Sequence, residues 1–318
     1  MLRSVLFATK PEYYWVSLLL FLGIVLVLIL CWKRVDFASV HEGFQQEQPY
    51  LYITGDSVYS DPLYISMYNR LMLPADILDN ITTQVVEMTQ PSVQQSSILD
   101  LGSGTGALAA KLAKKGGYHV FGIDKSPAMI ETSTKDYAYI PTLHFKEGNF
   151  LEPMMWESGS FSHILCTGFT LYTLEDAVKR TLLENAFHWL RPGGYLVVQL
   201  VDPAKFQTIV PGGRPPIPVP PSSERIVNTV IDFVDFKYNA SFLFPQKEDP
   251  TTTTTTMQLR ESFVDGLTHN VRQLEQTFAM MSVRDVLKMA LRCGFQGQGY
   301  VEMKHDAHQY LYVFVKPT

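Results

Sequence analysis

The sequence predicts an α/β domain built on an open, mostly parallel β-sheet with helices on both faces. Strand-like and helix-like segments alternate between residues 97 and 201, as in successive βαβ units. A glycine-rich turn, ILDLGSGTGAL at 98–108, joins the first strand to the first helix of this region. Two strand-like segments near the C-terminus, 295–304 and 308–316, are spaced so closely that they can only be antiparallel neighbours.

The elements can be justified in order along the chain. Apolar residues at three- and four-residue spacing predict a helical region over 61–88, with a break at Pro74. Ser126 followed by Pro127 is typical of a helix start, and Gly116-Gly117 of a helix end. The expected strands are 97–101, 119–124, 142–149, 160–168 and 195–202, and the expected helices between them are 107–116, 126–136 and 174–190.

The chain changes character after the fifth strand. A proline-rich connection at 211–221 is followed by a strand-like alternation over 229–244 and by a hairpin around Asp265-Gly266. A helix with Ser282 as its cap then leads to the final antiparallel strands. We therefore expect an antiparallel β insertion, about residues 203–281, between strands five and six of the sheet.

Composition narrows the classes of protein that this chain can be. It has 318 residues, a formal net charge of −5 and 18% charged residues, which is not a disordered composition. No basic run of five or more residues occurs, which disfavours a nucleic-acid partner. The three cysteines are far apart and form no C-x-x-C pair, so neither a disulfide framework nor a metal site is expected.

An uncharged apolar stretch, WVSLLLFLGIVLVLILCW, runs from Trp15 to Trp32. As a helix it would be about 27 Å long, close to the thickness of a bilayer core. The alternative is a cleaved signal peptide, but the bulky, charged sequence CWKRVDF that follows offers no cleavage site of small residues. We expect a retained transmembrane helix over about 13–32 in an N-terminal segment 1–34, then a tether over 35–57 and a domain over 58–318.

The glycine-rich turn alone fits two nucleotide ligands. Gly102, Gly104 and Ala107 satisfy the dinucleotide pattern G-x-G-x-x-G/A, whereas Asp100 and Gly106 extend the same glycines to D-x-G-x-G-x-G. The first pattern would indicate an NAD-dependent oxidoreductase. A carboxylate at Asp100 would repel a pyrophosphate, and it suits the cationic amino group of S-adenosylmethionine.

Two later features bear on the same choice. Asp124 closes the second strand and can accept hydrogen bonds from ribose hydroxyls, which both ligands possess. Asn149-Phe150, after the third strand, can bond and stack an adenine, or can be a polar loop residue beside a core phenylalanine. The chain is expected to end in a helix and an antiparallel pair of strands, with the seventh strand lying in the sheet between the fifth and the sixth. Such an ending does not complete a dinucleotide-binding fold.

The ordered set ILDLGSGTGAL, VFGIDKSPAMI, EGNF, FSHILCTGFTLYTLED, LRPGGYLVV and QYLYVFVKP resembles the class I S-adenosylmethionine-dependent methyltransferases. The resemblance covers residues 58–318 as architecture, with the specific motifs in 97–200. It implies a Rossmann-like, seven-stranded, mostly parallel sheet with an antiparallel terminal strand. It also implies S-adenosylmethionine as the cofactor and a substrate lid in the insertion 203–281.

The resemblance further implies individual site residues. In this family the glycine loop passes under the methionine part of the cofactor, the acid after strand two holds the ribose, and the pair after strand three contacts adenine. That pair more often begins with Asp, so Asn149 departs from the family pattern. A tyrosine-containing segment, here VYSDPLYISMYNRL, often closes over the cofactor, although its tyrosines could simply pack on the sheet. The implied cofactor-binding residues are Asp100, Gly102, Ser103, Gly104, Gly106, Asp124, Lys125, Met129, Asn149, Phe150, Cys166, Tyr64 and Tyr68.

The segment after the fourth strand faces the transferable methyl group in this family. Residues 166–172 lack the N/D-P-P-Y/F motif of nucleic-acid and glutamine N-methylating relatives, so we expect no nucleic-acid substrate. Tyr172 is a candidate for orienting the substrate, and no catalytic base is identifiable. The acceptor stays open between a small molecule, a lipid and a membrane protein. Because S-adenosylmethionine is made in the cytosol, we expect the domain to face it; a non-catalytic protein that binds the cofactor is the alternative.

Overall fold

The computed structural model describes two units, Met1–Glu47 and Gln48–Thr318. In the first unit residues 18–27 are helical, and the remainder of the predicted transmembrane helix over 13–32 lies outside the described residues. Within the described parts of the chain, none of the helices combines the length and the apolar character that crossing a bilayer requires. The described residues are 18–27, 46–214, 228–244, 254–304 and 306–318.

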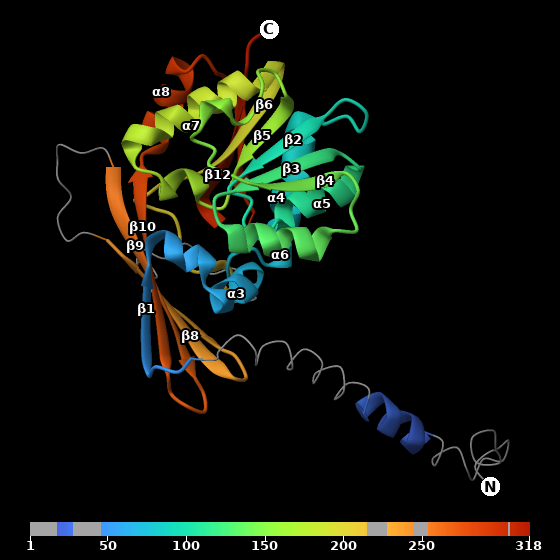
Figure 1. Ribbon diagram of the computed structural model, residues 1–318, viewed down its shortest axis with the longest axis vertical. Helices are drawn as coiled ribbons and strands as arrows, with labels where there is room; N and C mark the ends of the chain where they lie inside the picture. The colour runs from blue at the N-terminus through green and yellow to red at the C-terminus, as the bar shows by residue number, and fades with distance from the viewer. Residues whose placement is uncertain (1–17, 28–45, 215–227, 245–253, 305) are drawn as a thin grey trace, which may run out of the picture. The chain divides into compact units, whose positions relative to one another are not determined.

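The second unit contains a seven-stranded sheet in the order β11-β12-β6-β5-β2-β3-β4 (Figure 1). β12 is antiparallel to both of its neighbours, and the other pairs are parallel. The predicted seven-stranded, mostly parallel sheet is therefore confirmed, with the last strand inside the one before it. The strands are β2 (Ser97–Leu101), β3 (His119–Asp124), β4 (Leu143–Glu147), β5 (Phe161–Cys166), β6 (Leu190–Val201), β11 (Gln296–Met303) and β12 (Asp306–Val315).

Helices pack against both faces of this sheet (Figure 1). Two of them, α4 and α5, share an apolar core with the sheet through residues such as Ile81, Leu112 and Val120. On the other face α7 contacts α8 and β6, as right-handed crossovers require when the strand order reverses at β2. The helices are α3 (Pro62–Met72), α4 (Ala75–Thr89), α5 (Ala107–Gly116), α6 (Pro127–Tyr137), α7 (Asp176–Trp189) and α8 (Val283–Arg292).

Two helix starts follow directly from the sequence. The Ser126 hydroxyl accepts a hydrogen bond from the Met129 N–H, and Pro127 occupies the first helical position of α6. The Ser282 hydroxyl accepts in the same way from the Asp285 N–H at the start of α8. Both side chains satisfy a backbone donor that has no partner within its helix.

The insertion between β6 and α8 builds a second sheet of five strands, in the order β1-β10-β9-β8-β7. The four strands of the insertion are antiparallel to one another, as predicted. Their buried side chains alternate with exposed ones, so one face of this sheet packs on the rest of the unit. The strands are β1 (Tyr50–Thr54), β7 (Asn228–Asp232), β8 (Phe236–Leu243), β9 (Thr254–Asp265) and β10 (Val271–Met281).

The structure differs from the expected tether over 35–57 at the C-terminal end of that segment. Tyr50–Thr54 forms β1, which pairs in parallel with β10 from Tyr50 opposite Val271 onward. The sequence YLYIT is rich in aromatic and β-branched residues, which favour strands. Its partner strand lies far away in the insertion, so no local pattern could reveal the pairing.

Candidate active site

The turn between β2 and α5 is shaped by three glycines at alternate positions. Gly102, Gly104 and Gly106 have φ angles of 67°, 52° and 78°, a region that residues with a side chain disfavour. A Cβ atom at Gly106 would overlap the ring of Phe145. The turn can therefore pass close to β3 and β4 only because Gly106 carries no side chain.

Ser103 lies inside this turn. The N–H groups of Gly102 and Ser103 both donate to the carbonyl of Ile123, at 2.8 and 3.0 Å. The Ser103 hydroxyl is buried and has no hydrogen-bond partner among the described residues. Buried polar atoms are usually paired in native proteins, so this hydroxyl is consistent with a ligand at the turn.

Asp124, at the end of β3, fixes the turn from the other side. One of its carboxylate oxygens accepts from the Gly104 N–H at 2.9 Å, and the other accepts from the Ser126 N–H at 2.9 Å. Burial raises the pKa of this carboxyl, and the two hydrogen bonds oppose the rise. Because a carboxylate has about four lone-pair sites, acceptor capacity is left for the hydroxyls of a ribose.

Asp100, in β2, is the second carboxyl of the site and the more buried one, with only 3% of its surface exposed. Burial, and to a lesser degree the charge of Asp124, raise the pKa of Asp100 to about 7. Tyr68 and Cys166 are the other titratable groups that interact with its charge. A cation beside the two carboxyls would favour their ionised forms, so the pair fits a ligand that carries an ammonium or sulfonium group.

A cover segment, Gly55–Met72, contains the 3-10 helix η2 (Gly55–Ser60) and α3. The Asp61 carboxylate caps α3 by accepting from the Tyr64 N–H at 2.9 Å. From α3, the Tyr68 ring lies 3.6 Å from where a Gly104 Cβ would be. The structure thus brings Tyr68 onto the glycine turn, and its contact with the cofactor stays a prediction.

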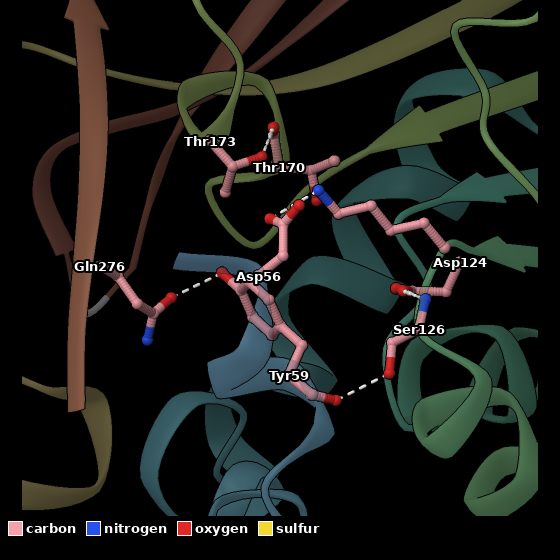
Figure 2. A network of polar contacts seen from close by, with 8 residues as sticks. Asp56, Tyr59, Asp124, Ser126, Thr170, Thr173 and Gln276 are labelled. Atoms are coloured by element: carbon pink, nitrogen blue, oxygen red, sulfur yellow. Dashed lines mark hydrogen bonds and ion pairs between the residues drawn. The ribbon is translucent and has the colours of Figure 1, made fainter. Parts of the chain in front are cut away.

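The cover segment is also tied to the loop after β3. The Tyr59 carbonyl accepts from the Ser126 hydroxyl at 2.7 Å, and the Tyr59 hydroxyl donates to Gln276 on β10 at 2.6 Å (Figure 2). Tyr64 is directed the same way, since its hydroxyl oxygen accepts from the Gln276 amide at 3.0 Å. The structure therefore places Tyr64 beside the second sheet and not on the glycine turn.

Two of the three predicted adenine contacts lie in the interior. Met129 on α6 and Phe150 after β4 are both buried. Asn149 is exposed, and its side-chain oxygen accepts from the Leu151 N–H at 3.0 Å. The Asn149 amide thus closes its own turn with one lone pair of its oxygen, and its contact with adenine stays a prediction.

Three other candidates have the following surroundings. Lys125 forms an ion pair with Asp56 at 2.6 Å. Cys166 is buried at the end of β5, and burial raises its thiol pKa to about 12. The hydroxyl of Tyr172, which is fully buried, accepts from the Val201 N–H at 2.9 Å. Tyr172 therefore anchors the loop after β5 to β6, and an orienting role toward substrate is not supported.

A largely apolar cavity adjoins the glycine turn. Tyr68 lines this cavity and also packs on Gly104, so the cavity and the turn share a wall. Gly168 and Phe169, after β5, line it as well. The remaining walls come from α3, α4 and the insertion, with side chains that include Met72, Ile77, Phe206, Met257, Leu259 and Phe278.

The polar groups of the cavity are amides, phenols and one guanidinium. Gln199 accepts from the Gly168 N–H at 2.9 Å and donates to Gln309 at 3.0 Å, so β6, β12 and the loop after β5 are bonded together. Gln207, Gln276 and Arg214 also line the cavity.

Sequence reasoning missed a buried polar group behind this wall. Glu261 on β9 is fully buried and accepts from the Tyr238 hydroxyl at 2.6 Å and from the Gln276 amide at 3.0 Å. Burial raises the pKa of Glu261 to about 7. The signal was present: Glu261 and Gln276 interrupt runs of alternate apolar residues, at positions where the pattern expects an apolar side chain.

Known proteins match the chain at the same region. Residues 98–194 match the family described as Methyltransferase domain. The chain is 36% identical over 110 residues to a demethylmenaquinone methyltransferase of Chlorobaculum tepidum, and 30% identical over 112 residues to phosphoethanolamine N-methyltransferase 1 of Zea mays. These matches cover 34% and 33% of this chain, and only 43% and 21% of the two relatives.

Solved structures share the fold more widely. The CcbJ methyltransferase of Streptomyces caelestis aligns with a TM-score of 0.60 at 17% identity, over 80% of this chain and 96% of that one. CalS10, an amino pentose methyltransferase of Micromonospora echinaspora solved with S-adenosylmethionine bound, aligns with a TM-score of 0.57 at 17% identity and the same coverage. The match identifies a methyltransferase domain at residues 98–194, and the sheet order together with the solved structures shows that the chain has the Rossmann-like fold of class I S-adenosylmethionine-dependent methyltransferases.

Proposed function

We propose that this protein transfers a methyl group from S-adenosylmethionine to a small, largely apolar acceptor that enters the cavity beside Tyr68. The observation that carries the proposal is the shared wall. Tyr68 packs on Gly104 of the glycine turn and lines the cavity, so a cofactor on the turn and an acceptor in the cavity would meet there.

The residues have separable tasks in this proposal. Asp124 and the glycine turn hold the cofactor, and Asp100 faces its cationic part. The bound cofactor supplies an activated methyl group, so the protein contributes mainly proximity, orientation and exclusion of water. Tyr68 and Phe169 supply the apolar surface between the two ligands.

We also propose that the insertion, residues 203–281, acts as the acceptor lid of a domain that extends to Thr318. It contributes Phe206, Val210, Met257 and Phe278 to the cavity wall. A small acceptor agrees with the names of the similar proteins, which refer to demethylmenaquinone, phosphoethanolamine and an amino pentose.

Calorimetry of the full chain with S-adenosylmethionine tests the cofactor assignment. Asp124→Ala removes two charge-assisted hydrogen bonds as well as the ribose acceptor, and we expect its affinity to fall about 100-fold. Asp232→Ala, at the exposed end of β7, is the matched control and should keep wild-type affinity. Equal affinity of the two variants would contradict the assignment.

Radiolabelled cofactor and a fractionated cell lysate test turnover and the class of acceptor. We expect label in the small-molecule or lipid fraction. Tight binding of S-adenosylmethionine with no label in any fraction would favour the alternative, a non-catalytic protein that binds the cofactor through the same fold.

The N-terminal stretch supports a further proposal, that the protein is anchored in a membrane with its domain in the cytosol. The support for the anchor is the uncharged sequence from Trp15 to Trp32. Two basic residues lie on each side of it, so Lys33 and Arg34 are compatible with a cytosolic domain without favouring it. Extraction of cell membranes at alkaline pH would leave an anchored chain in the pellet. Release of the full-length chain into the supernatant would contradict the anchor.

A further inference from the structure

The buried Glu261 carboxyl organises the polar side chains beside the cavity. It accepts hydrogen bonds from Tyr238 and from the nitrogen of the Gln276 amide. Glu261 accepts from the amide nitrogen at 3.0 Å, so the nitrogen end of Gln276 faces Glu261 and its oxygen faces the other way. The direction of each hydrogen bond around Gln276 follows from this one constraint.

The orientation of the Gln276 amide fixes the direction of its hydrogen bonds with two tyrosines of the cover segment. Its oxygen accepts from the Tyr59 hydroxyl (Figure 2). Its nitrogen carries two hydrogens, which are donated to Glu261 and to the Tyr64 oxygen, both at 3.0 Å. Tyr64 is therefore the acceptor in its bond with Gln276, and its own hydrogen points elsewhere.

The hydrogen of the Tyr64 hydroxyl has no acceptor within the part of the chain that the structure describes, and Tyr64 lines the cavity. Burial raises the pKa of Tyr64 well above its usual range, so the hydroxyl stays protonated. A buried donor without a partner is unfavourable. An oxygen atom on a molecule in the cavity would relieve that cost.

The polar groups of the cavity wall are mostly neutral. Arg214 is the one charged side chain among the described lining residues, and the amides of Gln199, Gln207 and Gln309 add neutral polar groups. An oxygen atom on an acceptor molecule can accept the Tyr64 hydrogen. An ammonium ion has only donors to offer, so it cannot accept that hydrogen.

We infer that the Tyr64 hydroxyl donates a hydrogen bond to an oxygen atom of the methyl acceptor, which is an apolar molecule carrying a carbonyl, carboxylate or phenolate oxygen. Gln276 and Glu261 are positioning residues that keep the Tyr64 hydrogen directed into the cavity. The inference rests on the proposed function and adds to it the chemical class of the acceptor.

Three bicyclic probes of similar shape test the inference by calorimetry on the full chain saturated with S-adenosylhomocysteine. These are 2-naphthoate, 2-acetylnaphthalene and 2-naphthylmethylammonium. We expect the anion and the ketone to bind more tightly than the ammonium. Tyr64→Phe should weaken naphthoate about tenfold and the ketone about threefold, because hydrogen bonds to charged groups are the stronger ones. It should leave the ammonium within twofold.

Tyr118→Phe is the matched control, because Tyr118 is a buried tyrosine in the core under α5 that does not line the cavity. The order of the three probes on the wild-type chain tests the inference without any variant. Preference for the ammonium, equal weakening of all probes by Tyr64→Phe, or no binding of any probe would overturn the inference alone. Failure of the wild-type chain to bind S-adenosylhomocysteine would overturn the proposed function, and the inference with it.

Discussion

The cofactor end of the seven-stranded sheet and the cavity beside the five-stranded sheet make their contacts with different kinds of chemical group. At the glycine turn the contacts are made by backbone N–H groups, by glycines with positive φ and by two carboxyls, the buried Asp100 and the partly buried Asp124. In the cavity they are made by side chains, mostly apolar ones with a few amides. Side chains can be exchanged without moving the backbone, so acceptor choice can change while the cofactor turn stays the same.

The cover segment belongs to both regions. Tyr59 uses its carbonyl toward Ser126 on the cofactor side and its hydroxyl toward Gln276 on the cavity side. Tyr68 packs on Gly104 while lining the cavity. A change that loosens this segment should therefore affect both regions, whereas changes elsewhere should affect one of them.

Arg272→Met should have the largest effect, because it breaks the attachment of the cover segment to β10. Arg272 and Asp61 form an ion pair at 3.0 Å with side chains only 6% and 4% exposed. Loss of Arg272 leaves a buried carboxylate without its partner, and we expect the free energy of unfolding to fall by about 3 to 5 kcal/mol. Urea denaturation followed by circular dichroism measures this change.

Arg260→Met is the control for that variant. Arg260 pairs with Glu275 at 2.9 Å on the same sheet, but its side chain is 46% exposed. Removing such a pair should cost less than about 1 kcal/mol. If the two variants lost equal stability, burial of the Asp61–Arg272 pair would not be what holds the cover segment.

Gly106→Ala should disrupt the cofactor end with a somewhat smaller effect. Alanine would adopt an unfavourable positive φ and its Cβ would overlap Phe145, so we expect a loss of about 3 kcal/mol in the free energy of unfolding. Gly55 also has positive φ but has open space around it. Gly55→Ala should therefore cost only about 1 kcal/mol, and an equal cost would show that the close approach to Phe145 is unimportant.

Asp100 should make cofactor binding depend on pH. Its pKa lies at about 7 in the free protein, and the cationic cofactor favours the ionised carboxylate. Affinity for S-adenosylmethionine should thus rise about fivefold from pH 6 to pH 7, as the carboxyl loses its proton. Calorimetry at both pH values should show a smaller rise in Asp100→Asn. The same rise in the variant would assign the dependence to Asp124.

Lys125→Gln should have the smallest effect. The Lys125 side chain is 49% exposed and pairs with an exposed Asp56, so the free energy of unfolding should change by less than about 1 kcal/mol. Cofactor affinity should stay within about twofold of wild type, because Lys125 points toward the cover segment. A larger loss of affinity in the same titration would show that Lys125 contributes to cofactor binding.

The seven-stranded sheet could be predicted because its signals are local. Each βαβ unit carries its own caps and turns, and Ser126 or Gly106 can be identified within a few residues. The five-stranded sheet was predicted only in part. Tyr50 pairs with Val271, and a pairing between such distant segments leaves no periodic trace in either of them.

The residues of the site also differ in whether local sequence signals could predict their position. Asp124, the glycines and Tyr68 lie at the turn because strand and helix ends fix their position. Tyr172 follows β5 as expected, yet the short helix after that strand turns its hydroxyl toward Val201. The roles of Glu261 and Gln276 depend on contacts between two strands and the cover segment, and only the three-dimensional structure reveals them.

The edge position of β1 has a practical consequence for anyone who shortens the chain. A fragment that begins at residue 58 would lose Tyr50–Thr54 and leave the backbone donors and acceptors of β10 uncovered along that edge. Open edges of this kind recruit strands from other molecules and promote aggregation. A recombinant catalytic fragment should therefore begin no later than Gln48, where the second unit starts.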